Sequence, residues 1–240
     1  WAGHNLACAE LLRRQSGEPD PARLGRHLVE AGRPEEAIEP LYAGCIRATR
    51  SASWGKDQLL LDELHRALLE ASIPGEDPRF LDYRVLASRV AINMEDLVVA
   101  RREIEHAERD AQLSGFRANQ AAALHQKGRL VARDAGPLAA RPILERALQL
   151  FEESGDEVGS LRCSLSLGTV LGRSGELERA RKAYRRAMQQ VGAADDTHRR
   201  VQGFLGLVHT ELSGERFDEV DRLAQVGLDW AGVRAVRWVQ

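Results

Sequence analysis

The chain matches itself best when it is shifted by about 40 residues, and this period constrains its fold more than any other feature. Sequence periods of about 20 to 50 residues are typical of stacked structural repeats. The units run 1–40, 41–80, 81–120, 121–160, 161–200 and 201–240, and the first is the most degenerate. We call the residues at one position of successive units a column. Two columns lie in the first and second halves of the unit, Gly168, Gly128, Ser88, Ala48 and Cys8, and Ala180, Ala140 and Ala100. Two more follow in the second half, Tyr184, Leu144, Ile104 and Leu64, and Ala187, Ala147, Ala107 and Ala67.

Each unit predicts two helices. Apolar or small residues recur at offsets of three and four, which gives each helix one buried stripe. The chain is rich in Ala, Leu, Arg and Glu and has only 5% aromatic residues, a composition that favours helices over strands. Turn signals separate the helices at Gly17, Trp54-Gly55, Ala135-Gly136-Pro137, Ser174-Gly175, Ser213-Gly214, Pro74-Gly75, Ser114-Gly115 and Ser154-Gly155.

The small residues have a mechanical explanation. A second helix can cross close to the first only where no bulky side chain intervenes. We therefore expect Gly168, Ala180, Tyr184 and Ala187 to be contact points between packed helices.

The bulk properties exclude several classes of protein. The formal net charge of -2 gives no basic field for nucleic acid, and no apolar run of about 18 residues predicts a membrane span. Cys8, Cys45 and Cys163 lack disulfide-like or ligand-like spacing, which favours a reducing compartment and a cytoplasmic protein. The chain begins "WAGHNLACAE", without Met or a signal peptide, so we expect it to be a fragment of a longer chain.

Two segments resemble the tetratricopeptide repeat (TPR). They are "LGTVLGRSGELERARKAYRRA", residues 167–187, and "LGRHLVEAGRPEEAIEPLYAG", residues 24–44, which is out of register with the units above. The early Trp and late Pro of the family pattern are absent, and the period exceeds the usual length of about 34 residues, as in an elongated subclass. The resemblance implies one all-α domain over 1–240, a right-handed α-α superhelix of about six hairpins. It also implies a scaffold that binds a protein or peptide without catalysis.

A second resemblance concerns the N-terminal part of the chain. "HNLACAELLRRQ" and the stretch from Pro21 to Cys45 are similar to the region after the nucleotide switch in large bacterial signalling proteins, where a kinase or STAND-type ATPase carries a helical-repeat tail. This implies the recognition arm of such a protein. The alternative is a module that inhibits or oligomerises an attached kinase, ATPase or DNA-binding domain.

No motif predicts catalysis, a metal or a cofactor. Gly55-Lys56 lacks the earlier Gly of a phosphate-binding loop, because Arg50 stands in its place, so a turn is expected there. The seven histidines form no His-x-x-x-His pair of the kind that binds zinc. The acidic pairs Glu35-Glu36, Glu152-Glu153 and Asp195-Asp196 are expected at helix starts or in loops, mostly as caps.

The family resemblance implies that the first helix of each unit lines a concave groove. Carried onto this chain, the groove positions predict a basic stripe of Arg89, Asn93, His125, Arg129, Arg133, Arg173 and Arg162. The planar guanidinium favours bidentate capture of carboxylate or phosphate, which predicts an acidic partner. The competing interpretation is that these are ordinary solvated arginines neutralised by neighbouring glutamates. The Lys and Asn set of the chaperone-binding carboxylate clamp is absent.

Apolar groove positions and tryptophans complete the expectations. Val85, Leu165 and Leu205 are expected to fill gaps in the groove. Trp230 and Trp238 are expected to belong to the interface with a next repeat, which truncation leaves partly bare.

Overall fold

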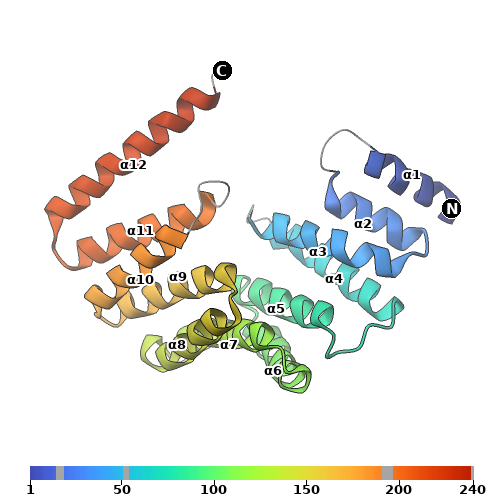
Figure 1. Cartoon of the computed structure of the whole chain (residues 1–240), viewed down its shortest axis with the longest axis horizontal. Helices are drawn as coiled ribbons and strands as arrows, with labels where there is room; N and C mark the ends of the chain where they lie inside the picture. The colour runs from blue at the N-terminus through green and yellow to red at the C-terminus, as the bar shows by residue number, and fades with distance from the viewer. Residues whose placement is uncertain (15–18, 51–53, 191–196, 239–240) are drawn as a thin grey trace. The chain divides into compact units, whose positions relative to one another are not determined.

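The structure is a computed structural model, and it describes residues 1–14, 19–50, 54–190 and 197–238. Within these ranges the chain contains helices and no strand, so the predicted all-α fold is confirmed (Figure 1). None of the described helices is both long and apolar enough to cross a membrane. The helices are α1 (Ala2–Arg14), α2 (Pro21–Glu30), α3 (Pro34–Arg50), α4 (Trp54–Glu70), α5 (Pro78–Asn93), α6 (Leu97–Ser114), α7 (Arg117–Asp134), α8 (Pro137–Ser154), α9 (Glu157–Arg173), α10 (Leu177–Gln190), α11 (Thr197–Ser213) and α12 (Phe217–Trp238).

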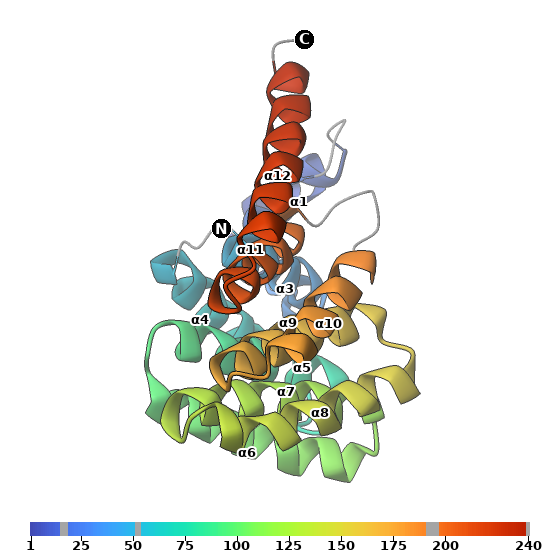
Figure 2. The ribbon, with the colours of Figure 1, turned by 90° about the vertical axis from the view of Figure 1, so that its left-hand side faces the viewer.

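The chain divides into two compact units, Trp1–Leu130 and Val131–Gln240, and the boundary lies within α7. In unit 1 each helix from α1 to α5 packs against the next one along the chain, up to the pair of α5 and α6. In unit 2 the same holds from α8 to α12, and Figure 2 shows α9, α10 and α11 in succession. Each unit is therefore a stack of antiparallel helices that follows the order of the sequence.

The period of the sequence is visible in the positions of the helices. The helices α6, α8, α10 and α12 begin one period apart, at Leu97, Pro137, Leu177 and Phe217. The same spacing separates the starts of α7, α9 and α11. Since the sequence columns and these helix starts share one period, each column occupies the same place in the successive helices of these two sets.

The small residues lie where helices cross. A Cβ atom added to Gly168 in α9 would lie 2.9 Å from the ring of Tyr184 in α10. One added to Gly25 in α2 would lie 2.6 Å from Cγ of Leu41 in α3. The two pairs have the same separation in sequence, so the two segments that resemble the repeat form the same contact. The repeated alanines of the second helices, Ala100, Ala140 and Ala180, are fully buried, which confirms the predicted contact points.

The register difference near the N-terminus has a structural explanation in α3. This helix packs against α2 on one side and against α4 on the other. It serves as the second helix of the pair with α2, where Gly44 lies against Ala22, and as the first helix of the pair with α4. A helix inside a continuous stack has two neighbours, and its pairing with either one can give the sequence pattern of a repeat.

The turns inside the hairpins use a left-handed residue. Glu95, Gly175 and Glu215 have φ of 64°, 80° and 55°, and whole periods of the sequence separate them. The predicted turn at Ser174-Gly175 is confirmed. The turn between α5 and α6 was not predicted, because Glu95 occupies the left-handed position and offers neither of the usual Gly and Pro signals.

Two local predictions are wrong. Trp54-Gly55 and Lys56 form the first turn of α4 rather than a connection, because a single glycine costs a helix only about 1 kcal/mol. Glu152-Glu153 lies in the last turn of α8, not at a helix start or in a loop. There Glu152 pairs with Arg186 of α10 at 2.6 Å, and this attraction opposes the unfavourable helix dipole.

Several predictions fall outside the described part of the chain. Gly17 and Asp195-Asp196 lie outside the described residues, and the side chains of Trp230 and Trp238 are likewise not described. Cys8, Cys45 and Cys163 form no disulfide with one another. Burial raises the pKa of Cys163 to about 12, and its thiol donates to the carbonyl of Leu144 at 3.3 Å, so it behaves as a core residue.

Candidate ligand-binding face

Polar side chains on the first helices of unit 1 meet across successive hairpins. Arg89 of α5 donates from Nη2 to Oγ1 of Thr49 in α3 at 3.1 Å. Arg129 of α7 donates from Nη2 to Oδ1 of Asn93 in α5 at 2.8 Å. We call Thr49, Arg89, Asn93 and Arg129 the polar ladder, because each rung joins one first helix to the next.

The hydrogen bonds that form the ladder run from the guanidinium groups to neutral oxygens. Arg129 also donates from Nη1 to Oε1 of Gln126 at 2.8 Å, and Gln126 is only 4% exposed. The hydroxyl of Thr49 donates to the carbonyl of Ile46 at 2.9 Å, so its lone pairs point away from its own helix towards Arg89. These bonds orient both arginines before any ligand arrives, and preorganisation of this kind reduces the entropy lost on binding.

The structure brings together part of the predicted stripe. Arg89, Asn93 and Arg129 are half-buried and share one face of unit 1. His125 is 5% exposed, so it lies behind that face rather than on it. Gln126, which orients Arg129, was not among the predicted residues. The sequence feature that could have indicated Gln126 is its position three residues before Arg129, about one helical turn away.

The other predicted residues, Arg133, Arg162 and Arg173, belong to unit 2. Arg133 and Arg173 are exposed near the ends of α7 and α9, and Arg162 is half-buried in α9. A stripe through all seven residues stays a prediction.

The apolar positions expected in the groove differ from one another. Val85 is half-buried and Leu165 is buried in the core, whereas Leu205 of α11 is exposed. Leu165 therefore packs inside unit 2 instead of lining a surface.

In the α5–α6 hairpin, Arg84 stands where the family pattern has its early Trp, and it belongs to a buried polar cluster. Nε of Arg84 lies 3.1 Å from Asp110, and Nη1 lies 3.7 Å from Glu103 and 2.8 Å from Nδ1 of His106. A guanidinium can only donate, so Nδ1 of His106 is the acceptor of this hydrogen bond. The guanidinium also lies 4.8 Å from the ring centre of Phe80. The cluster satisfies its own charges and therefore serves packing rather than binding.

The aromatic neighbours of this cluster are also enclosed. Tyr83 stacks on His65 with ring centres 4.8 Å apart. Burial, with a smaller contribution from the charge of Glu103, raises the pKa of Tyr83 to about 12. Tyr83 is thus a neutral core residue at ordinary pH.

Unit 2 contains a second buried ion pair. Arg181 of α10 donates from Nε and Nη2 to the two carboxylate oxygens of Glu211 in α11, at 2.5 and 2.7 Å. The side chains are 4% and 0% exposed. Leu171 stands one period before Glu211 in the sequence. At this position of the repeat, a charged residue in an ion pair therefore replaces an apolar one.

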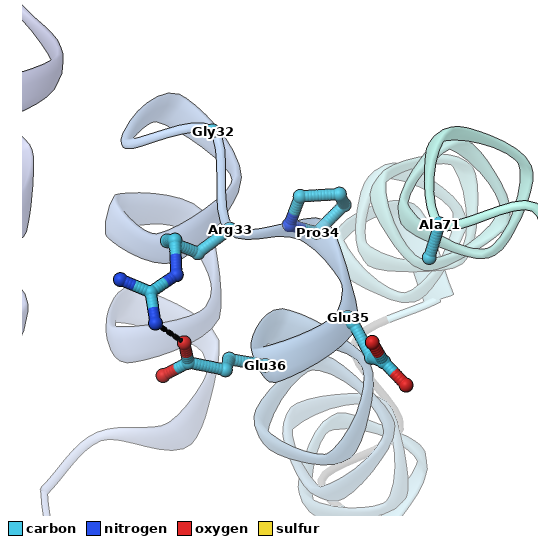
Figure 3. A pocket seen from close by; sticks show the side chains of 6 residues that line it. All are labelled: Gly32, Arg33, Pro34, Glu35, Glu36 and Ala71. Carbon is cyan, nitrogen blue, oxygen red and sulfur yellow. Dashed lines mark ion pairs between the residues drawn. The ribbon is translucent and has the colours of Figure 1, made fainter.

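A surface hollow of about 470 Å³ lies at the turn between α2 and α3, beside the end of α4 (Figure 3). Its lining includes Arg33, which pairs with Glu36. Glu36 also accepts a hydrogen bond from Arg13, and this bond holds the pKa of the Glu36 carboxyl below its ordinary value. The charged side chains of the hollow are therefore already paired, Glu36 with Arg33 and Arg13 and Glu35 with Arg79, which makes it a poorer ligand site than the polar ladder.

The described residues contain no group of three His, Cys, Asp or Glu side chains placed to hold a metal ion.

Comparison with known proteins agrees with this architecture. Residues 119–191 match the family model for the tetratricopeptide repeat. No curated protein matches the chain in sequence. A crystal structure of BtubC from P. vanneervenii is 16% identical, with a TM-score of 0.63, over 96% of this chain and 92% of that one.

Two further solved structures have the same fold. A Rap protein complexed with competence and sporulation factor is 11% identical, with a TM-score of 0.58, over 98% of this chain and 79% of that one. A kinesin light chain-like repeat protein from Podosopora anserina is 14% identical, with a TM-score of 0.54, over 95% and 98%. At these identities the likeness concerns the fold alone. The chain therefore has a tetratricopeptide-like helical-repeat fold, and residues 119–191 are the segment that matches the family model.

Proposed function

We propose that this chain is a non-catalytic scaffold that binds a peptide or protein segment along the first helices of unit 1. The observation that carries the proposal is the polar ladder, in which hydrogen bonds to neighbouring side chains orient Arg89 and Arg129. The fold is one whose members generally act as interaction modules. The Rap relative is a complex with a factor, which is consistent with a peptide partner for this fold.

The chemistry of the ladder favours an acidic partner. An arginine fork binds a carboxylate through charge-assisted hydrogen bonds that are about twice as strong as neutral ones. Asn93 adds an amide, which has both donors and an acceptor, and can read the backbone of an extended peptide. Arg133, Arg162 and Arg173 are proposed as further contacts for acidic groups in unit 2.

The proposal is tested by selecting short peptides from a display library against the whole chain. We expect enrichment of peptides with Asp or Glu, and affinity that falls as salt rises, because exposed charge pairs are screened. Arg89→Glu combined with Arg129→Glu should lower the affinity for the selected peptide by about tenfold or more.

The matched control is Arg23→Glu combined with Arg146→Glu. These two exposed arginines lie on α2 and α8, outside the ladder, and the control makes the same change in net charge. Equal loss of affinity in both double variants would refute a site at the ladder, as would a library that yields no binder.

We also propose a context for this scaffold, the recognition arm of a larger bacterial signalling protein. It is supported by the resemblance of the N-terminal stretch to repeat tails that follow a nucleotide switch. The full-length coding sequence tests it directly. A kinase or STAND-type ATPase domain before residue 1 is expected, and its absence would remove the proposal without touching the polar ladder.

A further inference from the structure

The hydrogen bonds of the polar ladder determine how far apart its two guanidinium groups lie. Arg89 reaches from α5 to Thr49 on α3, and Arg129 reaches from α7 to Asn93 on α5. One guanidinium group therefore lies between α3 and α5, and the other lies between α5 and α7. The helix α3 also packs directly against α5. Because packed helices lie about 8–10 Å apart, the two groups are separated by roughly this distance across the helices.

The same bonds determine which polar atoms the ladder presents to a ligand. A guanidinium only donates, so the amide oxygen of Asn93 faces Arg129 and its NH₂ group is turned away from that arginine. The hydroxyl of Thr49 donates to the carbonyl of Ile46 and accepts from Arg89. The ladder thus offers mainly N–H donors, which suit a ligand that contributes carboxylates and backbone carbonyls.

The spacing and the donors together select the conformation of a bound peptide. In an α-helix most backbone carbonyls are already bonded within the helix. In a β-strand, residues on one face recur about 6.6 Å and then about 13 Å apart, which does not match the ladder. The polyproline II helix has three residues per turn, a rise of about 3.1 Å per residue and no internal hydrogen bonds. Residues three positions apart then share one face at about 9 Å, and the carbonyls remain available.

We propose, on the basis of the proposed function, that the partner segment binds the polar ladder as a polyproline II helix with two acidic residues three positions apart. One carboxylate binds Arg89 and the other binds Arg129, while the amide of Asn93 donates to a backbone carbonyl between them. Proline is favoured at the intervening positions because its ring fixes this conformation. The N–H that proline lacks is not required by a site that consists mainly of donors.

Peptides of identical composition test the spacing. Three synthetic peptides contain the same six prolines and two glutamates, and the glutamates stand two, three or four positions apart. Affinity for the whole chain is measured by fluorescence anisotropy at low salt. We expect the peptide with a separation of three to bind at least about tenfold more tightly than the other two, because it alone gains both charge-assisted hydrogen bonds.

A fourth peptide tests the conformation. It keeps the two glutamates three positions apart and has glycine in place of every proline. We expect it to bind about fivefold more weakly than its proline counterpart, because a flexible chain loses more conformational entropy on binding.

Variants of the protein locate the two contacts. Arg89→Ala and Arg129→Ala each leave one of the two guanidinium groups, so each should remove the preference for a separation of three. Because the two arginines lie on different helices, either variant alone is sufficient if the other does not fold. The matched control is Arg23→Ala, which removes an exposed arginine of α2 outside the ladder and should keep the preference.

The inference and the proposed function fail in different ways. Equal affinity for the three separations, or a glycine peptide that binds as tightly as the proline peptide, would overturn the polyproline II geometry. If Arg89→Glu/Arg129→Glu still lowered the affinity for a peptide selected from the library, the proposed function would remain supported. Failure of all four peptides to bind would also overturn the inference, and the proposed function would then depend on the library selection.

Discussion

At the scale of single residues, the pair of Arg181 and Glu211 is the clearest case of one chemistry replaced by another within the repeat. Leu61 stands three periods before Arg181, and Leu171 stands one period before Glu211, so both columns accept leucine. Removing one partner of a buried pair leaves an uncompensated charge, whereas replacing both with apolar residues is often neutral.

We therefore expect Glu211→Leu to lower the free energy of unfolding by about 3–5 kcal/mol, because Arg181 would remain buried without its carboxylate. The double variant with Arg181→Leu should recover most of this loss. Urea denaturation of the whole chain measures both. A double variant as unstable as the single one would show that the charges themselves are required.

The same pair predicts a dependence on pH. The hydrogen bond from Arg181, followed by the charges of Arg181 and Arg216, lowers the pKa of Glu211 below its ordinary value of 4.5. A carboxyl whose pKa is lower in the folded state stabilises the fold above its unfolded pKa, and this contribution disappears as pH falls through the folded pKa. We expect the chain to lose stability below about pH 4.5. In Glu211→Gln, thermal denaturation across this range should show a weaker dependence, and an unchanged one would contradict the assignment.

At the scale of helices, two glycines of α9 allow a matched test of the packing argument. A Cβ atom on Gly168 would lie 2.9 Å from the Tyr184 ring, whereas one on Gly172 would meet its nearest neighbours at 3.9 Å. Gly168→Ala should cost about 1 kcal/mol through overpacking. Gly172→Ala should gain about 0.5–1 kcal/mol, because alanine favours helix without a clash. Equal effects in thermal denaturation would mean that close approach does not explain the small column.

The turns between helices offer a second prediction at this scale. Glu215 has φ of 55°, a conformation that costs a side-chain-bearing residue about 1–2 kcal/mol. Glu215→Gly should raise the free energy of unfolding by about 0.5–1 kcal/mol after the entropy of glycine is counted. Gly175→Ala, at the equivalent position with φ of 80° and nothing within 4 Å, should have the opposite sign. Urea denaturation that shows no gain for Glu215→Gly would contradict this explanation of the turn.

The elements also show what the sequence could and could not predict. The small columns and the glycine turns were predictable, because they follow from periodicity and backbone conformation. The turn at Glu95 was missed, since a strained position need not carry glycine. The α4 start at Trp54 was missed because a single glycine is a weak stop signal.

Among the site residues, the arginines of the polar ladder follow from the groove positions that the family resemblance implies. Asn93, the partner of Arg129, follows from the same positions. The pairing of Thr49 and Gln126 with these arginines does not, because both are ordinary polar residues until the helices are packed. The clusters around Arg84 and Glu211 were equally hidden, since each is a departure from the family pattern whose partner lies on another helix.

At the scale of each unit, the molecule combines a first-helix face with fixed polar groups and second helices linked by ion pairs. In unit 2, Arg179 pairs with Glu145 and Arg186 with Glu152, both at 2.6 Å and both between α10 and α8. These exposed pairs contribute little individually, and salt screens them. The packing of the small columns is therefore expected to contribute more to the stability of unit 2 than these pairs do.

Hydrogen exchange of the whole chain, with and without the acidic peptide selected against it, tests most directly whether recognition occurs on that face. If the peptide binds at the polar ladder, it should protect the segments of α3, α5 and α7 that carry Thr49, Arg89, Asn93 and Arg129. This protection should be absent in Arg89→Glu/Arg129→Glu. Protection confined to the second helices α4 and α6, or unchanged in the double variant, would contradict it.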